Sequence, residues 1–133
     1  LKRDATNAEH LMTGPVATVE ARDSVAMARD LMLEGGFTQV PVVRGGKLAG
    51  LLTARTLLEI LETHPDESWH QQSVEDVCPL NRAEWTVVAR DTPLELVMTA
   101  LRAGHVAVIV TPNGRASEKP LGIITPGDLL NRL

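Results

Sequence analysis

The sequence predicts an α/β (α+β) fold in which one βαββα unit occurs twice, and two observations carry this prediction. The first is an internal repeat, because residues 18–36 (TVEARDSVAMARDLMLEGG) match residues 86–104 (TVVARDTPLELVMTALRAG), and residues 50–58 (GLLTARTLL) match residues 122–130 (GIITPGDLL). The second is size, because one such unit is too small to bury both faces of its strands. Two units are therefore expected to pack as a pseudo-twofold pair, with two small sheets inside and the helices outside.

The first repeat predicts its elements in chain order. They are a strand at residues 18–19, a helix from Ser24 to the stop at Gly35 and Gly36, a strand at residues 40–43, a tight turn at Gly45 and Gly46, a strand at residues 48–52, and a second helix capped by Thr53. The core-facing stripe of the first helix is expected to hold Val25, Ala28 and Met32, and Met27 is assigned a packing role on the same helix.

The second repeat predicts the same order with a stronger helix start. Thr92, Pro93 and Glu95 have the spacing of a capping box, with a cap, a proline at the first position and an acid at the third. The remaining expected elements are a strand at residues 86–87, a helix stripe of Leu94, Val97, Met98 and Leu101, a stop at Gly104, a strand at residues 106–109, a longer loop (TPNGRASEKP), a strand at residues 121–124 and a helix capped by Thr125.

Domain boundaries follow from the repeat. We expect a first repeat with its lead-in at residues 1–62, a linker at residues 63–73 and a second repeat at residues 74–133. The stretch ETHPDESWHQQS around the linker is polar and predicts a surface connection. The chain begins with Leu rather than Met, and we expect it to be a piece of a longer protein.

Composition excludes several classes of function. The net charge is −4 with no basic block, which argues against a nucleic-acid partner. No apolar run is long enough for direct membrane insertion, and the single cysteine, Cys78, excludes an internal disulfide. Cys78 precedes a proline and has no partner histidine, so we expect a small core residue rather than a nucleophile.

No group of residues here predicts autonomous catalysis or a metal site. The sequence pairs no acid and base with a nucleophile and has no phosphate-binding glycine loop. The stretch HPDESWH contains His64, Asp66, Glu67 and His70, but their irregular spacing in an expected loop favours a chance cluster. We therefore expect neither an enzyme nor a metal-binding protein.

Several coincident motifs resemble the CBS domain pair, also called the Bateman module. They are LMTGPVATVEARDSV, GGFTQVPVV and GKLAGLLTARTLL in the first half, and VEDVCPLNRAEWTVVARDTPL with PLGIITPGDLL in the second. The resemblance covers nearly the whole chain and is specific for the fold. It is much less specific for function, because such pairs accompany many different proteins.

The resemblance implies binding of an adenosine-containing molecule (AMP, ADP, ATP or S-adenosylmethionine) in a cleft between the repeats. The family motif Gly-x-x-Thr/Ser-x-x-Asp is complete at residues 122–128, where Asp128 would bind the ribose hydroxyls and Thr125 would lie near ribose or phosphate. The same cleft would take lead-in backbone from Thr13 to Ala17. The nucleotide-binding residues that we expect are Asp128, Thr125, Ile124, His105, Val106, Thr13, Pro15, Val16 and Ala17, with His105 placed to reach phosphate.

The first repeat departs from this motif, because Thr56 stands where the second repeat has Asp128. Threonine supplies no charged acceptor for a diol, so a weaker second cleft is expected, formed by Thr53, Thr56, Arg55 and Trp85. Asp128 itself has an ordinary alternative, since an acid at this position also stabilises a helix start. Three other candidate residues also have ordinary structural interpretations. Arg55 would be a solvated helix residue, His105 a turn residue, and Trp85 a core or interface residue.

The resemblance therefore predicts a regulatory module with an adenine nucleotide (AMP, ADP or ATP) as its ligand and with no required cofactor. It would be cytoplasmic, either in a soluble protein or as the cytosolic domain of a membrane protein, and would act on an attached effector domain. The alternative is a ligand-free structural module. In both cases we expect a homodimer, formed through the helices that follow TVEARD and GLLT.

Overall fold

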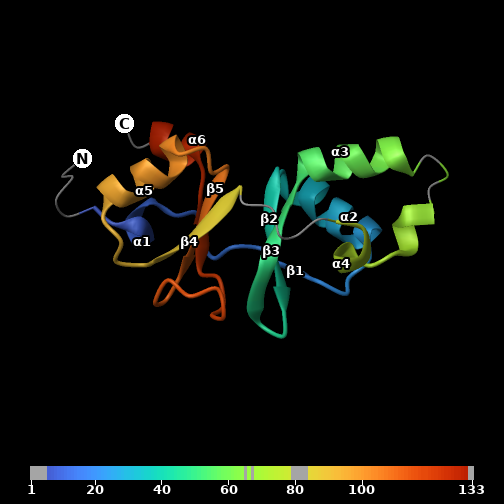
Figure 1. The fold of residues 1–133 in the computed structure, drawn as a ribbon, viewed down its shortest axis with the longest axis horizontal. Coiled ribbons are helices and arrows are strands. Elements are labelled where there is room, and N and C mark those ends of the chain that lie inside the picture. Colours follow the sequence, from blue (N-terminus) through green and yellow to red (C-terminus); the bar gives the residue numbers. More distant parts are fainter. Residues whose placement is uncertain (1–5, 65, 67, 79–83, 132–133) are drawn as a thin grey trace. The chain divides into compact units, whose positions relative to one another are not determined.

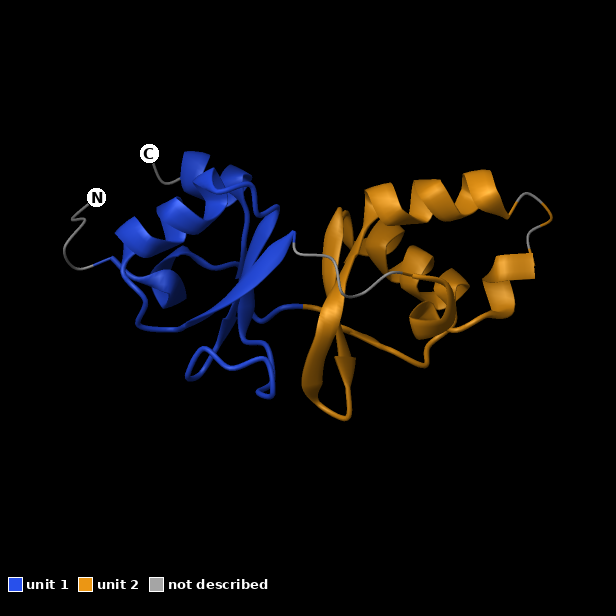
Figure 2. Ribbon diagram, viewed as in Figure 1, with its two compact units in different colours: residues 1–16, 82–133 blue, residues 17–81 orange. Residues whose placement is uncertain are grey.

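The protein is described by a computed structural model that covers residues 6–64, 66, 68–78 and 84–131. The chain divides into two compact units that do not follow the sequence repeats (Figure 2). Unit 1 contains residues 1–16 and 82–133, and unit 2 contains residues 17–81. The lead-in of each repeat thus packs with the other repeat.

Unit 2 contains a three-stranded sheet in the order β1-β2-β3, drawn in blue to green in Figure 1. Its strands are β1 (Val19–Glu20), β2 (Gln39–Arg44) and β3 (Lys47–Thr53); β1 is parallel to β2, and β2 is antiparallel to β3. The turn between β2 and β3 has Gly45 and Gly46 at φ 60° and 80°, which suits a two-residue hairpin with both residues left-handed. The helices of this unit are α2 (Val25–Gly35), α3 (Ala54–Thr63), the 3-10 helix η2 (Ser68–Gln71) and α4 (Val74–Val77).

Unit 1 repeats this sheet. Its strands β4 (Trp85–Ala89), β5 (Ala107–Thr111) and β6 (Gly122–Ile124) have the order β4-β5-β6, with β4 parallel and β6 antiparallel to β5. The helices are α1 (Ala8–Leu11), α5 (Leu94–Arg102) and α6 (Pro126–Leu130). The predicted α+β class and the βαββα order of both repeats are confirmed.

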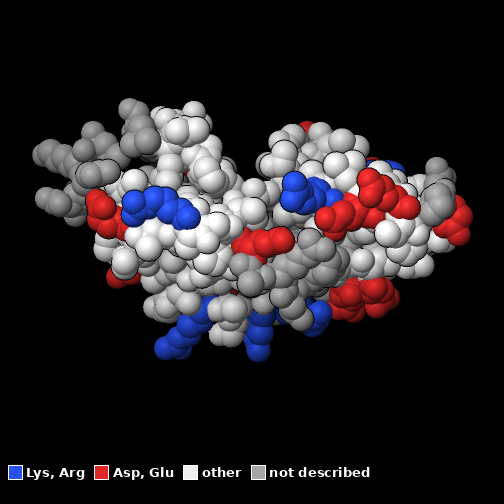
Figure 3. All heavy atoms as spheres, turned by 45° about the horizontal axis from the view of Figure 1, so that its top comes forward, with Lys and Arg blue, Asp and Glu red and all other residues white. Residues whose placement is uncertain are grey.

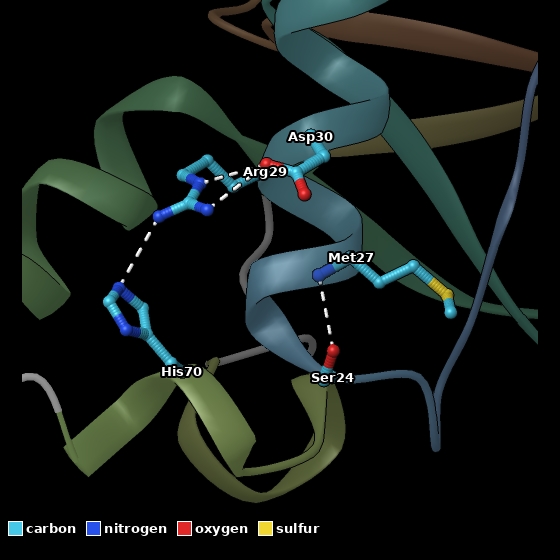
Figure 4. Close-up of polar contacts among 5 residues, drawn as sticks. All are labelled: Ser24, Met27, Arg29, Asp30 and His70. Atoms are coloured by element: carbon cyan, nitrogen blue, oxygen red, sulfur yellow. Dashed lines mark hydrogen bonds and ion pairs between the residues drawn. The ribbon is translucent and has the colours of Figure 1, made fainter.

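The start and the end of α2 follow the sequence prediction. Ser24 is the N-cap, and its Oγ accepts a hydrogen bond from the Met27 N–H at 3.1 Å, as the close-up shows (Figure 4). Gly36 ends the helix in the left-handed conformation at φ 67°. Val25, Ala28 and Met32 are buried as predicted, but the packing role assigned to Met27 is wrong, because Met27 is 57% exposed.

The capping box predicted at Thr92 is also wrong. Helix α5 begins one residue later, with Pro93 as the N-cap, and no side chain caps it. The Thr92 carbonyl instead accepts a hydrogen bond from the Ala8 N–H at 2.8 Å, and the Thr6 carbonyl accepts one from the Leu94 N–H at 3.1 Å. The lead-in therefore binds the start of α5 through the backbone, which is a tertiary contact that local sequence does not reveal.

The linker is more than a surface connection. Helix α3 runs on to Thr63, and η2 places Trp69 in the core of unit 2 with 3% of its surface exposed. Helix α2 and the sheet supply seven other members of that core, namely Val19, Val25, Ala28, Met32, Val40, Val42 and Leu52. The surface prediction fails at Trp69, because a single large apolar side chain determines where the polar stretch packs.

Within the described ranges, no helix has the length and apolar character needed to cross a membrane. On the face shown in Figure 3, both basic and acidic side chains are present, with uncharged surface between them.

Candidate functional site

The segment from β6 into α6 forms the site around Asp128. Strand β6 ends at Ile124, and Thr125 is the N-cap of α6 with extended backbone (φ −119°, ψ 166°). Pro126 then occupies the first helical turn, where its missing N–H costs nothing. This local sequence puts Asp128 at the third helical position, so that its side chain turns back toward the cap.

Asp128 is held by its own helix start. Its Oδ2 accepts hydrogen bonds from the Thr125 N–H at 2.8 Å and from the Thr125 hydroxyl at 3.1 Å. The backbone bond is the acidic half of a capping box. The ordinary structural role of Asp128, which the sequence left open, is therefore present in the molecule.

The lead-in contributes a third donor to Asp128. The Thr13 hydroxyl donates to Oδ1 at 3.0 Å, although the two residues are 115 positions apart. Thr13 is placed there by the backbone, since its N–H donates to the Ile123 carbonyl at 2.9 Å and its carbonyl accepts from the Ile123 N–H at 3.1 Å. The family resemblance implied lead-in backbone near Asp128, but nothing in the sequence indicated this side-chain bond.

Gly122 makes this close approach possible. A Cβ atom at position 122 would lie 2.4 Å from Sδ of Met12 and 2.8 Å from the Thr13 carbonyl oxygen. A side chain at this position would therefore push the lead-in away from β6 and Thr13 away from Asp128. The glycine of the motif is needed for this packing whether or not a ligand binds.

The other expected residues of this site differ in accessibility. Thr13 and Pro15 are exposed, Val16 and Ala17 are half-buried, and the Ile124 side chain is fully buried in the core of unit 1. Ile124 could thus contact a ligand only through its backbone. Ala17 is the first residue of unit 2, so residues 13–17 run from one unit into the other.

His105 and Val106 lie at the start of β5. The His105 Nδ1 donates to the Ala100 carbonyl at 2.9 Å, which leaves Nε2 as the ring nitrogen that could meet a ligand. Val106 is 37% exposed. Among the described residues, no hydrogen bond joins His105 to Asp128.

The matching position of the first repeat has different surroundings. Thr56 is 4% exposed, its N–H donates to Oγ1 of Thr53 at 3.2 Å, and the two hydroxyl oxygens are 3.1 Å apart. Arg55 beside it is exposed. Among the described residues, Thr53 and Thr56 present two hydroxyls that are bonded to each other, and neither side chain supplies a carboxylate.

Trp85, the other residue assigned to the weaker cleft, begins β4 in unit 1. It is half-buried, and its indole Nε1 is buried without a hydrogen-bond partner among the residues that the structure describes. The lead-in of the second repeat continues into residues 79–83, which lie outside the described ranges. The structure therefore describes only part of this second site.

The described His and Asp side chains of the HPDESWH stretch form hydrogen bonds with different neighbours. The His64 Nδ1 lies 2.9 Å from the Thr63 hydroxyl, and Asp66 accepts from the Ser68 hydroxyl at 2.9 Å, a bond that lowers the pKa of Asp66. Glu67 lies outside the described residues. Within the described ranges, no group of three or more His, Cys, Asp or Glu side chains could hold a metal ion.

His70 meets Arg29 instead of its sequence neighbours. The two side chains point toward each other from η2 and α2, with Nη1 of Arg29 3.3 Å from Nε2 of His70 (Figure 4). Because a guanidinium only donates, Nε2 of His70 accepts this bond. Arg29 also pairs with Asp30 at 3.0 Å and lies 5.9 Å from the centre of the Trp69 ring, so this cluster fastens the linker to α2.

Cys78 follows α4 and is 5% exposed in the core of unit 2. Burial raises the pKa of its thiol to about 11. The expectation of a small core residue is confirmed, since a thiol with this pKa is a poor nucleophile at neutral pH.

Comparison with known proteins agrees with the repeated βαββα fold described above. A family model described as "CBS domain" matches residues 8–63 and again residues 74–133. Among curated proteins, the A-adding tRNA nucleotidyltransferase of Geobacter sulfurreducens is 25% identical over 123 residues. That match covers 92% of this chain but only 13% of the relative.

Two solved structures share the fold. CBSX2 in complex with AMP has a TM-score of 0.73 at 23% identity, over 95% of this chain and 94% of that chain. The CBS domain pair of protein MJ0100, in complex with 5′-methylthioadenosine and S-adenosyl-L-methionine, has a TM-score of 0.77 at 18% identity, over 96% and 95% of the two chains.

Proposed function

This chain belongs to the CBS domain family, with two tandem copies of the domain, and we propose that it is a regulatory module that binds an adenosine-containing molecule at Asp128. The ligand class is an adenine nucleotide (AMP, ADP or ATP) or S-adenosylmethionine. The proposal involves no catalytic step and no required cofactor.

The arrangement of the Asp128 carboxylate carries this proposal. A carboxylate has about four acceptor positions, and the described donors fill two on Oδ2 and one on Oδ1. One position on Oδ1 is left for a ligand hydroxyl, on a side chain whose orientation is already fixed. A charged acceptor held in this way binds a hydroxyl without first losing side-chain freedom, which favours affinity.

The comparisons support the choice of ligand class. CBSX2 is described with AMP, and the MJ0100 pair with 5′-methylthioadenosine and S-adenosyl-L-methionine. These three molecules share an adenosine with a ribose diol, whose two hydroxyls can donate charge-assisted hydrogen bonds to an ionised acid. Thr125 lies beside the acid and, with His105, is proposed to lie near the ribose or the phosphate.

We also propose that ligand binding regulates a domain attached to this module. The chain spans 13% of the curated relative that it matches, which fits a module within a larger protein. A ligand that binds better to one arrangement of the repeats shifts the population toward that arrangement, and an attached effector domain would sense the change. We place the module on the cytoplasmic side, where adenine nucleotides are abundant.

Calorimetry with AMP, ADP, ATP and S-adenosylmethionine tests the proposal. At least one should bind more tightly than millimolar and raise the melting temperature as its concentration rises. Asp128→Asn keeps an acceptor for the cap but removes the charge, and it should weaken binding about 10- to 100-fold, which corresponds to the loss of a charge-assisted bond. Asp30→Asn, which changes an exposed acid on α2, is the matched control and should bind as the wild type does.

If none of the four molecules binds more tightly than millimolar, the sensor proposal fails. If one binds but Asp128→Asn leaves its affinity unchanged, Asp128 is only a helix-start residue and the site is elsewhere.

A second candidate function, a structural dimerisation module, is favoured by a specific surface of unit 2. An open groove of about 290 Å³ lies between α2 and α3, and its lining is mostly apolar. Leu33 is 73% exposed and Leu58 is 61% exposed at this groove. Apolar side chains gathered in this way mark association surfaces, and these helices are the ones expected to form a homodimer.

Sedimentation tests the dimer independently of the nucleotide titrations, which separate the two candidates. Under the dimer proposal the wild type sediments as a dimer at micromolar concentration, and Leu58→Glu shifts it to the monomer without lowering nucleotide affinity at Asp128. Glu34→Gln, an exposed change on α2 outside the groove lining, is the control. A wild type that remains monomeric at every accessible concentration argues against the dimer.

A further inference from the structure

We propose that Thr13 is a specificity-determining residue, and that its hydroxyl and the Asp128 carboxylate together recognise the vicinal diol of the ligand ribose. This inference rests on the proposed function and deepens it by naming the second group that contacts the diol. It starts from the 3.0 Å hydrogen bond between Oγ1 of Thr13 and Oδ1 of Asp128.

The backbone fixes the position of Thr13. Two hydrogen bonds pair it with Ile123 at 2.9 and 3.1 Å, and helix α1 precedes it directly, with the Met12 N–H donating to the Ala8 carbonyl at 2.9 Å. Leu11 anchors this segment in the core of unit 1 with 2% of its surface exposed. The Thr13 hydroxyl is therefore supplied by a well-anchored segment, although the residue itself is exposed.

The chemistry of the pair matches a diol. When the Thr13 hydroxyl donates its proton to Oδ1, its own oxygen keeps two lone pairs that can accept. Oδ1 also keeps one acceptor position after receiving that proton. The two acceptor oxygens lie 3.0 Å apart at an exposed bond, a spacing close to that of the two oxygens of a cis-diol. One ribose hydroxyl donates to Oδ1 and the adjacent one donates to Oγ1 of Thr13.

The matching site of the first repeat lacks this pair. There the Thr53 and Thr56 hydroxyls bond to each other, and Thr56 is buried, so they present no charged and exposed acceptor. The two sites therefore differ in charge, and they also differ in whether two neighbouring oxygens remain able to accept hydrogen bonds from a diol.

Deoxynucleotides test the inference on the whole chain. AMP, 2′-deoxy-AMP and 3′-deoxy-AMP are titrated by calorimetry into the wild type, Thr13→Val and Thr13→Ser. Thr13→Val keeps the shape of the side chain but removes the hydroxyl, and it should weaken AMP binding about 3- to 10-fold, as expected for one neutral hydrogen bond. Thr13→Ser restores the hydroxyl and should restore the affinity.

Discrimination among the three nucleotides is the decisive measurement. The wild type should prefer AMP to both deoxy analogues, whereas Thr13→Val should bind AMP and one of the two analogues about equally, because the hydroxyl that met Oγ1 has lost its acceptor. A purely structural role for Thr13 would weaken all three nucleotides by the same factor and keep their ratios. Thr18→Val, an exposed change five residues further on, is the control and should behave as the wild type does.

The outcomes separate this inference from the proposed function. If the wild type binds none of AMP, ADP, ATP and S-adenosylmethionine, both fail. If AMP binds and Asp128→Asn weakens it, but Thr13→Val keeps the wild-type affinity or the wild-type ratios, the proposed function stands and the role of Thr13 is wrong. Circular dichroism and melting curves of both Thr13 variants verify that unit 1 remains folded.

Discussion

Asp128 and Thr56 occupy matching positions in the two repeats, and their surroundings differ in kind. Asp128 is half-buried and accepts three hydrogen bonds through both carboxylate oxygens. Thr56 is 4% exposed and shares a hydroxyl contact with its own cap. The second repeat thus has a half-buried acid where the first repeat has a buried threonine bonded to its own helix cap. The second repeat is therefore the better candidate for binding a ligand.

Cys78 gives a prediction at the scale of one residue. Burial raises the pKa of its thiol to about 11, so at pH 8 very little thiolate is present in the folded protein. Alkylation by iodoacetamide, followed by mass spectrometry, should be at least about 10-fold slower for the folded chain than for the chain in urea, since the thiolate is the nucleophile. Equal rates in the two states would show that the thiol is accessible and ionised as in a free cysteine.

The sequence could predict which residue types form the candidate site, but it could not predict how they meet. The repeat places the motif at residues 122–128, and the family resemblance adds the lead-in at residues 13–17 to the same site. The bond between Thr13 and Asp128 joins residues 115 positions apart, and only the pairing of the lead-in with β6 makes it possible. Local pattern contains no information about that pairing.

Helix starts give a prediction at the scale of an element. Ser24 caps α2 through its side chain, whereas Thr92 stands one residue before the N-cap of α5 and contributes its carbonyl instead. Ser24→Ala should lower the free energy of unfolding by about 1 kcal/mol, as is typical for loss of an N-cap. Thr92→Ala should change it by less than about 0.5 kcal/mol.

Urea unfolding of the two variants measures the difference. If Thr92→Ala costs as much as Ser24→Ala, the capping box indicated by the sequence exists in solution and α5 begins one residue earlier. Element order was predictable because apolar periodicity and glycine stops are local. The start of α5 was not, because backbone bonds from the lead-in decide it.

The loop between β5 and β6 gives a prediction about pH. Glu118 accepts hydrogen bonds from the Asn113 side chain at 2.8 Å, the Asn113 N–H at 2.9 Å, the Arg115 N–H at 3.1 Å and the Thr111 hydroxyl at 3.2 Å. Partial desolvation of the carboxylate raises its pKa, but these bonds outweigh it and hold the pKa of Glu118 below its ordinary value of 4.5. The folded state therefore favours the ionised form.

The sign of the pH effect follows from that shift. Because the pKa is lower in the folded chain than in the unfolded chain, the stabilisation is complete above the unfolded value and is lost as the pH falls through the folded value. The melting-temperature difference between the wild type and Glu118→Gln should stay constant from pH 7 to about pH 5 and shrink below that. A difference that grows on acidification would contradict this assignment.

At the scale of the whole molecule, the compact units and the sequence repeats divide the chain differently. Residues 1–16 lie in unit 1 with residues 82–133, while α4, which leads into the second repeat, lies in unit 2. Leu11 is buried in the core of unit 1 and Val74 in the core of unit 2. The repeat was visible in the sequence, and the resemblance implied lead-in backbone from Thr13 to Ala17 at the motif of the second repeat, but the burial of Leu11 and Val74 in the two cores was not predicted.

The exchange predicts that substitutions in a lead-in act on the other repeat. Leu11→Ala removes a side chain that is 2% exposed and packed in a core with Leu94, Val97 and Ile124, so it should cost about 2–5 kcal/mol. Hydrogen exchange of backbone amides should then show lost protection in β5 and β6, while β2 and β3 keep theirs, because local opening is confined to the unit that lost the contact.

Val74→Ala is the matched variant in the other lead-in, and it should give the opposite pattern, with faster exchange in β2 and β3. Val74 is fully buried against Ala21, Val25 and other members of the unit 2 core. If Leu11→Ala instead released β2 and β3, the lead-ins would belong to their own repeats. If both variants accelerated exchange equally everywhere, the units would unfold only together. The crossed pattern alone agrees with lead-ins that stabilise the opposite repeat, and it would show that the segment bearing Thr13 stabilises the sheet whose strand β6 leads into α6 and Asp128.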